Sequence, residues 1–206
     1  MTTLLQINSS LFANQGESSQ LAAQFVADWR TTNVDARVVN RDLAAQPIPH
    51  LTAERFQAFL SKPENRSAEQ QTVLDESDTL INELRSADVI VLGLPMYNFG
   101  LPSTLKAYFD HIARAGVTFR YSDKGPVGLV TGKKVYVFAT RGGYYAGSAK
   151  DTQTTYVRDF LAFIGITDVT FVYAEGLSIG AAPKQAALTK AQNDIQNLTG
   201  TQALAA

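Results

Sequence analysis

The feature that most constrains this chain is the regular alternation along the sequence of two patterns of apolar residues, one typical of strands and one typical of helices. Short apolar runs, such as DVIVLGL at residues 88–94, alternate with longer stretches in which apolar residues recur at helical spacing. DVIVLGL contains no polar alternation, which indicates a strand that is buried on both faces. Strands are predicted at residues 3–8, 36–40, 88–94, 134–140 and 168–174. Helices are predicted at residues 18–30, 52–60, 67–85, 102–114, 151–163 and 183–198.

This order of strands and helices predicts an α/β fold. Strands separated by helices form a parallel sheet through right-handed crossovers, with helices on both faces. Five strands favour the doubly wound, flavodoxin-like order 2-1-3-4-5. No linker divides the 206 residues, so one domain spanning residues 1–206 is expected. The glycine-rich stretch 116–131 is expected to be an extended excursion, and the tail at 201–206 is expected to fray.

Charge and composition exclude several function classes. A formal net charge of −1 gives no reason to expect nucleic acid or an anionic membrane as a partner. The absence of cysteine excludes disulfides, thiolate catalysis and cysteine-based zinc sites. The N-terminus lacks the basic and apolar regions of a signal peptide, and no apolar run approaches the ~20 residues of a membrane span. A cytoplasmic protein is therefore expected.

Three loops are candidates for a ligand site, because ligands of open α/β sheets bind beyond the carboxyl ends of the strands. Loop 9–19, SSLFANQGESS, offers hydroxyls and the start of a helix to a phosphate, although this loop taken alone favours plain N-capping by Ser18 and Ser19. Loop 95–100 offers apolar faces and backbone groups to a flat ring, or alternatively a dimer contact. Loop 140–145 holds two glycines that allow close backbone approach, or form a simple turn beside a solvated arginine.

Other motifs were weighed and set aside. Neither the dinucleotide fingerprint G-x-G-x-x-G nor a P-loop occurs in the chain. The segment GLSIG at residues 176–180 matches G-x-S-x-G literally, but both His50 and His111 precede Ser178, which contradicts the order of the hydrolase triad. Neither histidine lies near a second cluster of ligand-type residues, so no metal site is expected.

Longer segments carry a family resemblance. PMYNF at 95–99, ARAGVTFRY at 113–121, GLVTGKK at 128–134, RGG at 141–143 and GITDVTFVYAEG at 165–176 together resemble the FMN-dependent NADH-azoreductases. These are homodimeric, flavodoxin-like NAD(P)H:quinone oxidoreductases of bacteria. The resemblance covers nearly the whole chain, and the PMYNF and AGVTF blocks are its most specific parts.

The resemblance implies a set of site residues. FMN would be held by Ser10, Gly16, Glu17, Ser18, Pro95, Met96, Tyr97, Asn98, Phe99, Thr140, Arg141, Gly142 and Gly143. The substrate would meet Phe99, Tyr121, Tyr145 and Phe163, with Tyr121 and Phe163 contributed by a second subunit or, for Phe163, belonging to the core. Relatives commonly carry serine where this chain has Gly16, and Glu17 is expected to point its carboxylate outward. Arg141 is expected to bring positive charge toward the reduced ring.

The resemblance also implies a reaction. NADH or NADPH, with NADH favoured, would pass hydride to N5 of the flavin, and two electrons would then leave to a quinone or azo compound in a ping-pong cycle. No protein nucleophile is required. The alternative is a flavodoxin-type carrier that moves one electron at a time. The weak net charge and the excursion at 116–131 favour the enzyme.

Overall fold

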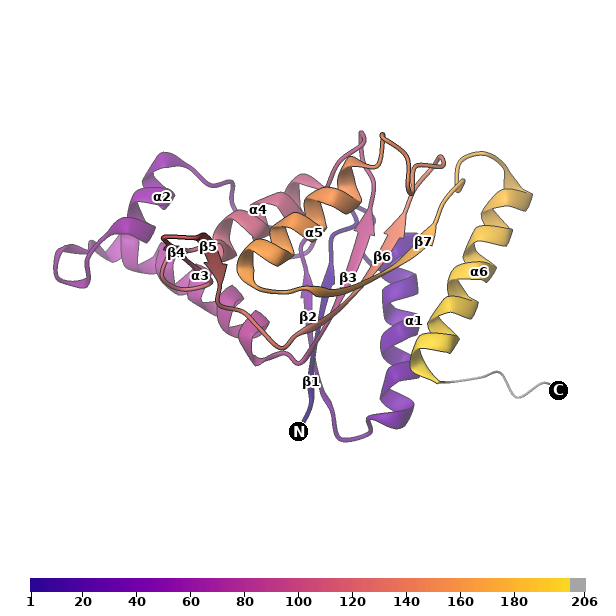
Figure 1. The fold of residues 1–206 in the computed structure, drawn as a ribbon, viewed down its shortest axis with the longest axis horizontal. Helices are drawn as coiled ribbons and strands as arrows, with labels where there is room; N and C mark the ends of the chain where they lie inside the picture. The colour runs from indigo at the N-terminus through magenta and orange to yellow at the C-terminus, as the bar shows by residue number, and fades with distance from the viewer. Residues whose placement is uncertain (201–206) are drawn as a thin grey trace.

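A computed structural model describes residues 1–200 and contains one five-stranded parallel sheet (Figure 1). Its strands are β1 (Thr3–Asn8), β2 (Arg37–Asp42), β3 (Val89–Pro95), β6 (Lys134–Thr140) and β7 (Asp168–Ala174). The order across the sheet is β2-β1-β3-β6-β7, and all four pairings are parallel. The predicted doubly wound order 2-1-3-4-5 is therefore confirmed. The point where the order reverses lies between β1 and β3.

Helices cover both faces of the sheet, as Figure 1 shows. The helices are α1 (Glu17–Thr32), α2 (Ala53–Leu60), α3 (Ala68–Ser86), α4 (Ser103–Ile112), α5 (Thr152–Ile164) and α6 (Ala181–Thr199), with short 3-10 turns at Ala13–Gln15 and Pro63–Asn65. α1 and α6 lie on one face, and α3, α4 and α5 lie on the other. α2 extends the second layer away from the sheet and packs on α3.

The core consists of two clusters of buried side chains, one on each face of the sheet. Neighbouring residues of one strand belong to opposite clusters, because successive side chains point to opposite faces of the sheet. Leu4 is in the cluster under α1, and Leu5 is in the cluster under α3 and α4. On the α1 side, Phe25 contacts Tyr136 and Phe138 with ring centroids 4.4 and 5.4 Å apart. This double burial explains why the strands lack polar alternation.

Local signals fix the ends of several helices. Ser67 and Gln70 form the predicted capping box at the start of α3. Asp151, which the sequence placed inside α5, is its N-cap and accepts a hydrogen bond from the backbone N–H of Thr154. Gly165 ends α5 with φ of 108°, a conformation that favours glycine. The predicted helix bounds are shifted by one or two residues relative to the structure.

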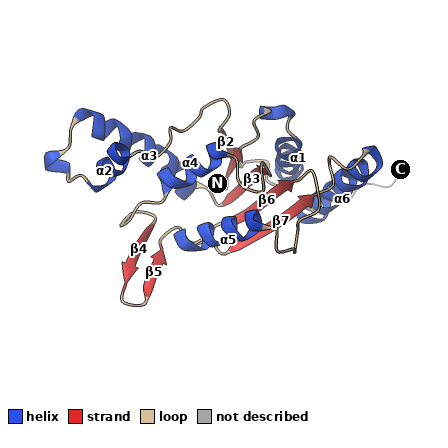
Figure 2. Ribbon diagram, turned by 90° about the horizontal axis from the view of Figure 1, so that it is seen from above, coloured by secondary structure: helices blue, strands red, loops and turns tan. Residues whose placement is uncertain are grey.

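The excursion at 116–131 is an antiparallel hairpin of β4 (Phe119–Ser122) and β5 (Gly125–Gly128). It stands away from the main sheet beside α5 (Figure 2). The hairpin contacts the end of α5 through Gly128. A Cβ at position 128 would lie 2.1 Å from the backbone nitrogen of Gly165. Only glycine allows this backbone-to-backbone contact. The tail at 201–206 lies outside the described residues.

Candidate functional site

A cleft of about 370 Å³ lies beyond the carboxyl ends of β1, β3, β6 and β7. Its lining consists of Ser10, Phe12, Gly16, Glu17, Ser18, Pro95, Met96, Tyr97, Thr140, Arg141, Gly142, Leu177 and Ser178. All three loops selected from the sequence contribute to it. The topology therefore brings them together where the strand order reverses, as expected for a ligand site in this class of sheet.

The start of α1 lines one end of the cleft. Gly16 is the N-cap and makes no side-chain cap, and the first intrahelical bond runs from the N–H of Gln20 to the carbonyl of Gly16. The preceding N–H groups of the first turn are therefore free of intrahelical acceptors. The Ser18 and Ser19 hydroxyls are buried, and within residues 1–200 neither has a hydrogen-bond partner. N–H donors, a buried hydroxyl and the positive end of the helix dipole together suit a phosphate.

Gly16 is explained by its neighbour Ser10. A Cβ at position 16 would lie 2.1 Å from the Ser10 hydroxyl oxygen, so the Ser10 side chain fills the space that a larger residue would need. That oxygen accepts a hydrogen bond from the N–H of Phe12 at 3.2 Å and lies 3.4 Å from the Tyr97 hydroxyl. The Ser10 hydroxyl therefore lies where a side chain at position 16 would begin.

Glu17 at the first position of α1 pairs with Lys184 of α6, with Oε1 and Nζ 2.6 Å apart. Both side chains remain partly exposed. The carboxylate next to the anion site is therefore matched by a cation.

The second loop makes a tight turn. The N–H of Tyr97 donates to the carbonyl of Gly100, and the N–H of Gly100 donates back, while Asn98 and Phe99 both have positive φ, at 49° and 64°. Such backbone is uncommon for residues other than glycine, and strain of this kind concentrates at functional sites. The turn leaves the Phe99 ring 58% exposed and perpendicular to Tyr145, with centroids 5.8 Å apart.

The same loop determines which backbone donors are free. The N–H of Met96 donates to the carbonyl of Thr140, so it is occupied. The N–H groups of Asn98 and Phe99 have no backbone acceptor within residues 1–200. The polar edge of a ligand can therefore bind at the N–H groups of the turn, whereas the N–H of Met96 is not available to it.

Arg141 differs from the expectation that it would carry charge toward the ring. Its side chain is fully buried and donates to Glu175 at 3.1 Å, Asp151 at 2.8 Å and Thr154 at 2.8 Å. The guanidinium also lies over the ring of Tyr173. Two carboxylates thus neutralise the cation, which ties the third loop to α5 and β7. Burial tends to raise the pKa of Asp151, but hydrogen bonds from Arg141 and Thr154 outweigh it and lower the pKa below the ordinary 3.8.

A fourth loop completes the cleft, and the sequence reasoning missed it. Leu177 and Ser178 follow β7, and the N–H of Ser178 donates to the carbonyl of Gly142 at 3.0 Å. A Cβ on Gly142 would lie 2.8 Å from the Ser178 hydroxyl oxygen, and one on Gly143 would lie 3.0 Å from the Tyr145 hydroxyl. The position of this segment after the carboxyl end of a strand is a signal for a ligand site, but its G-x-S-x-G pattern indicates a hydrolase motif instead.

Tyr121 and Phe163 do not reach the cleft of their own chain. Both pack on Phe119, with ring centroids 5.5 and 4.2 Å away. Thr152, at the start of α5, donates its hydroxyl to the carbonyl of Phe99, whereas Phe163 is near the other end. At a rise of 1.5 Å per residue, Thr152 and Phe163 are therefore separated along the helix by ~16 Å.

The hydrolase alternative finds no support. His111 is buried in α4, where its Nδ1 lies 2.8 Å from the carbonyl oxygen of Ala107 and its Nε2 accepts from Arg55 at 3.0 Å. Burial lowers its pKa below the ordinary 6.5. Among residues 1–200, no group of three or more histidine, cysteine, aspartate or glutamate side chains is placed to hold a metal ion. In the same part of the chain, no helix is both long and apolar enough to cross a membrane.

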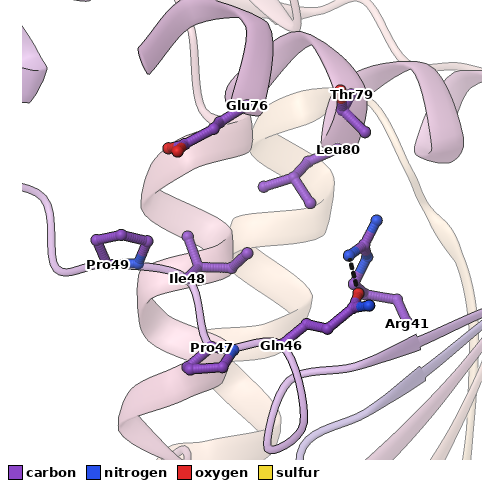
Figure 3. A pocket seen from close by; sticks show the side chains of 8 residues that line it. All are labelled: Arg41, Gln46, Pro47, Ile48, Pro49, Glu76, Thr79 and Leu80. Carbon is purple, nitrogen blue, oxygen red and sulfur yellow. Dashed lines mark hydrogen bonds between the residues drawn. The ribbon is translucent and has the colours of Figure 1, made fainter. Parts of the chain in front are cut away.

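A second cavity, of about 360 Å³, lies between the loop after β2 and α3 (Figure 3). Its polar groups are already paired: Arg41 binds Gln46, as Figure 3 shows, and also Glu83, while Glu76 pairs with Arg55. The remaining lining is largely apolar, with Pro47, Ile48, Pro49 and Leu80. The cavity therefore offers a ligand no free charged group.

The fold and the cleft define a flavodoxin-like protein with a mononucleotide-type site at its strand-order switch point. The profile of the family described as "Flavodoxin-like fold" matches residues 2–198. The FMN-dependent NADH:quinone oxidoreductase of Cellvibrio japonicus is 56% identical over 196 residues, which cover 95% of this chain and 98% of that protein. The protein of the same name from Herminiimonas arsenicoxydans is 49% identical over 201 residues, covering 96% and 98%.

Solved structures agree with these relatives. The crystal structure of an azoreductase from Bacillus anthracis superposes with a TM-score of 0.89 at 25% identity, covering 98% of this chain and 100% of that one. An FMN-dependent NADH-azoreductase from the same species, solved with FMN, shares the fold at a TM-score of 0.86, 24% identity, and coverage of 97% and 100%. The chain belongs to the family of flavodoxin-like, FMN-dependent NADH:quinone oxidoreductases, the family that the PMYNF and AGVTF blocks indicated.

Proposed function

We propose that this chain is an FMN-dependent oxidoreductase that transfers two electrons from NADH to quinones and azo compounds. The names of relatives at 49–56% identity support the activity. The observation that carries the cofactor assignment is the buried Ser18 hydroxyl, which has no partner within residues 1–200 and lies at the N-terminus of α1 in the cleft. A buried hydroxyl without a partner is costly, and a phosphate oxygen would supply the missing acceptor.

In this proposal the first loop holds the phosphate. The hydroxyls of Ser10 and Ser18 donate to it, together with backbone N–H groups that begin α1, at Glu17 and Ser18. Gly16 allows the Ser10 side chain to lie against the helix start. No lysine or arginine is required, because the helix dipole and the fixed N–H groups favour the anion.

The second and third loops hold the ring. Pro95, Met96 and Tyr97 of the second loop and Thr140 and Gly142 of the third line adjacent parts of the cleft. When bound, FMN supplies a ring that accepts hydride from NADH and passes two electrons to the acceptor. The backbone N–H groups of Asn98, Phe99, Gly142 and Gly143 stabilise the negative charge that develops at the ring's polar edge, since fixed dipoles need no reorganisation. Arg141 keeps these glycines in place through its carboxylate partners.

The acceptor binds against the perpendicular rings of Phe99 and Tyr145. Neither residue is in the cleft lining itself, but each follows a lining residue closely in the chain, Tyr97 and Gly142 respectively. NADH and the acceptor take this place in turn, which gives a ping-pong cycle. Tyr121 and Phe163 line the same space from a second subunit, since in their own chain they lie with Phe119 at the far end of α5. The protein acts as a homodimer in the cytoplasm, where NADH is available.

An anaerobic titration of the FMN-reconstituted protein with NADH tests the function. One equivalent of NADH per FMN is expected to bleach the flavin absorbance completely, and one equivalent of benzoquinone is expected to restore it. A parallel titration with NADPH measures the preference between donors. Bound flavin that NADH leaves unchanged would refute the enzyme and favour a one-electron carrier.

A further inference from the structure

Lys184 occupies an unfavourable place on its helix. It lies in the first turn of α6, where its backbone N–H donates to the carbonyl of Gly180. The positive end of the helix dipole disfavours a cation there. The same turn contains no acidic residue. What holds the ammonium group is Glu17 of another helix, with Nζ and Oε1 2.6 Å apart.

Glu17 is placed favourably on its own helix but unfavourably for an anionic ligand. Its carboxylate suits the start of α1, but Glu17 also lines the cleft next to Ser18, whose hydroxyl marks the phosphate position of the proposed function. A carboxylate repels a phosphate dianion that lies nearby, and the partly exposed position of Glu17 weakens that repulsion without removing it. The chain therefore carries a negative charge beside its own anion site and a lysine placed to cancel it.

We infer that Lys184 is a positioning residue for the cofactor phosphate, and this inference rests on the proposed FMN site. By holding the Glu17 carboxylate, Lys184 cancels the charge that would repel the phosphate. The pair thereby sets how strongly the site prefers phosphorylated FMN over riboflavin, which has the same ring and no phosphate. α1 and α6 contribute the two halves of the pair, so a contact between two helices tunes cofactor choice.

A purely structural role makes a different prediction. If the pair only joined α1 to α6, its loss would weaken the binding of FMN and riboflavin by the same factor. An electrostatic role changes FMN binding alone, in opposite directions for the two partners. Lys190 provides a matched control, because it lies further along α6, is exposed, and pairs with Asp194 at the same 2.6 Å.

The experiment measures dissociation constants of FMN and riboflavin by flavin fluorescence with purified apoprotein at low ionic strength. K184M is expected to weaken FMN binding by on the order of 3–10-fold and leave riboflavin binding unchanged. E17Q is expected to tighten FMN binding, the double variant E17Q/K184M to return to within about twofold of wild type, and K190M to match wild type. The effect of K184M is expected to shrink as NaCl is raised toward 1 M, where the Debye length is about 3 Å.

Equal changes in the FMN and riboflavin dissociation constants of K184M, or no change in either, would overturn the inference. The proposed function would still stand in that case, provided that the wild-type protein binds FMN. Weaker FMN binding in E17Q would overturn it as well. A wild-type protein that binds neither flavin would refute the cofactor assignment itself.

Discussion

Replacing Arg141 with methionine is expected to destabilise the protein by about 3 kcal/mol. The guanidinium is fully buried between Asp151 and Glu175, whose side chains are only 7% and 14% exposed. Removing one partner of a buried ion pair costs about 3–5 kcal/mol, because the remaining charge stays buried without compensation. Both carboxylates keep other donors, the N–H of Thr154 for Asp151 and the N–H of Tyr145 for Glu175, so the lower end of this range applies.

The assay is urea unfolding of the apoprotein at fixed protein concentration, with K106M as a control. Lys106 forms an ion pair with Asp110 at 2.5 Å, but both side chains are partly exposed, so K106M should cost less than about 1 kcal/mol. D151N added to R141M should recover part of the loss, since it removes one uncompensated charge. If R141M lowers the free energy of unfolding by no more than K106M does, the view that the ion pairs of Arg141 hold the third loop in place would be refuted.

The pH dependence of the same variant gives a second test. The pKa of Asp151 is lowered in the folded protein, so its contribution to stability is present above the unfolded value near 3.8 and is lost as pH falls below it. R141M lacks the hydrogen bond and charge that lower this pKa. The difference in unfolding free energy between wild type and R141M should therefore narrow between pH 5 and pH 3.

Three further predictions concern single side chains. S18A removes a buried hydroxyl without a partner, so it should leave apoprotein stability unchanged or raise it by up to about 1 kcal/mol while weakening FMN binding several-fold, as measured by urea unfolding and flavin fluorescence. The pKa of buried His111 is lowered, so wild type should lose stability as pH falls below 6.5 and H111Q should lose this dependence, as thermal unfolding between pH 7.5 and 5 would show. G128A should cost about 3 kcal/mol in urea unfolding, because its Cβ would meet the backbone of Gly165, which cannot move aside as a side chain can.

The sheet could be predicted because its signal is local. β6 and β7 match the predicted ranges residue for residue, since continuous apolar runs bounded by polar residues leave little choice of ends. The β4–β5 hairpin could not be predicted in the same way. Its second strand, β5, contains Gly125, Pro126 and Gly128, which give no strand period, and the position of the hairpin depends on contact with Gly165 far along the chain.

The site was predictable to the level of loops and not of side-chain directions. Topology alone selects the loops after β1, β3 and β6, and all three line the cleft. Arg141 shows the limit of this reasoning. Next to two glycines it suggests a free cation, but its direction is set by Asp151 and Glu175, which come from other elements. The loop after β7 was overlooked because its glycines and serine suggested a different enzyme class.

The charges around the cleft follow one pattern. Arg141 is neutralised by two carboxylates, and Lys184 is neutralised by Glu17. Neither cation that adjoins the cleft therefore carries an uncompensated charge toward a ligand. In the proposed site, the attraction for an anionic cofactor must come from the helix dipole, the N–H groups that begin α1 and the hydroxyls of Ser10 and Ser18. Such fixed dipoles act over short range and require a particular geometry, so in the proposed site they would hold a phosphate in one place without attracting every anion to the cleft.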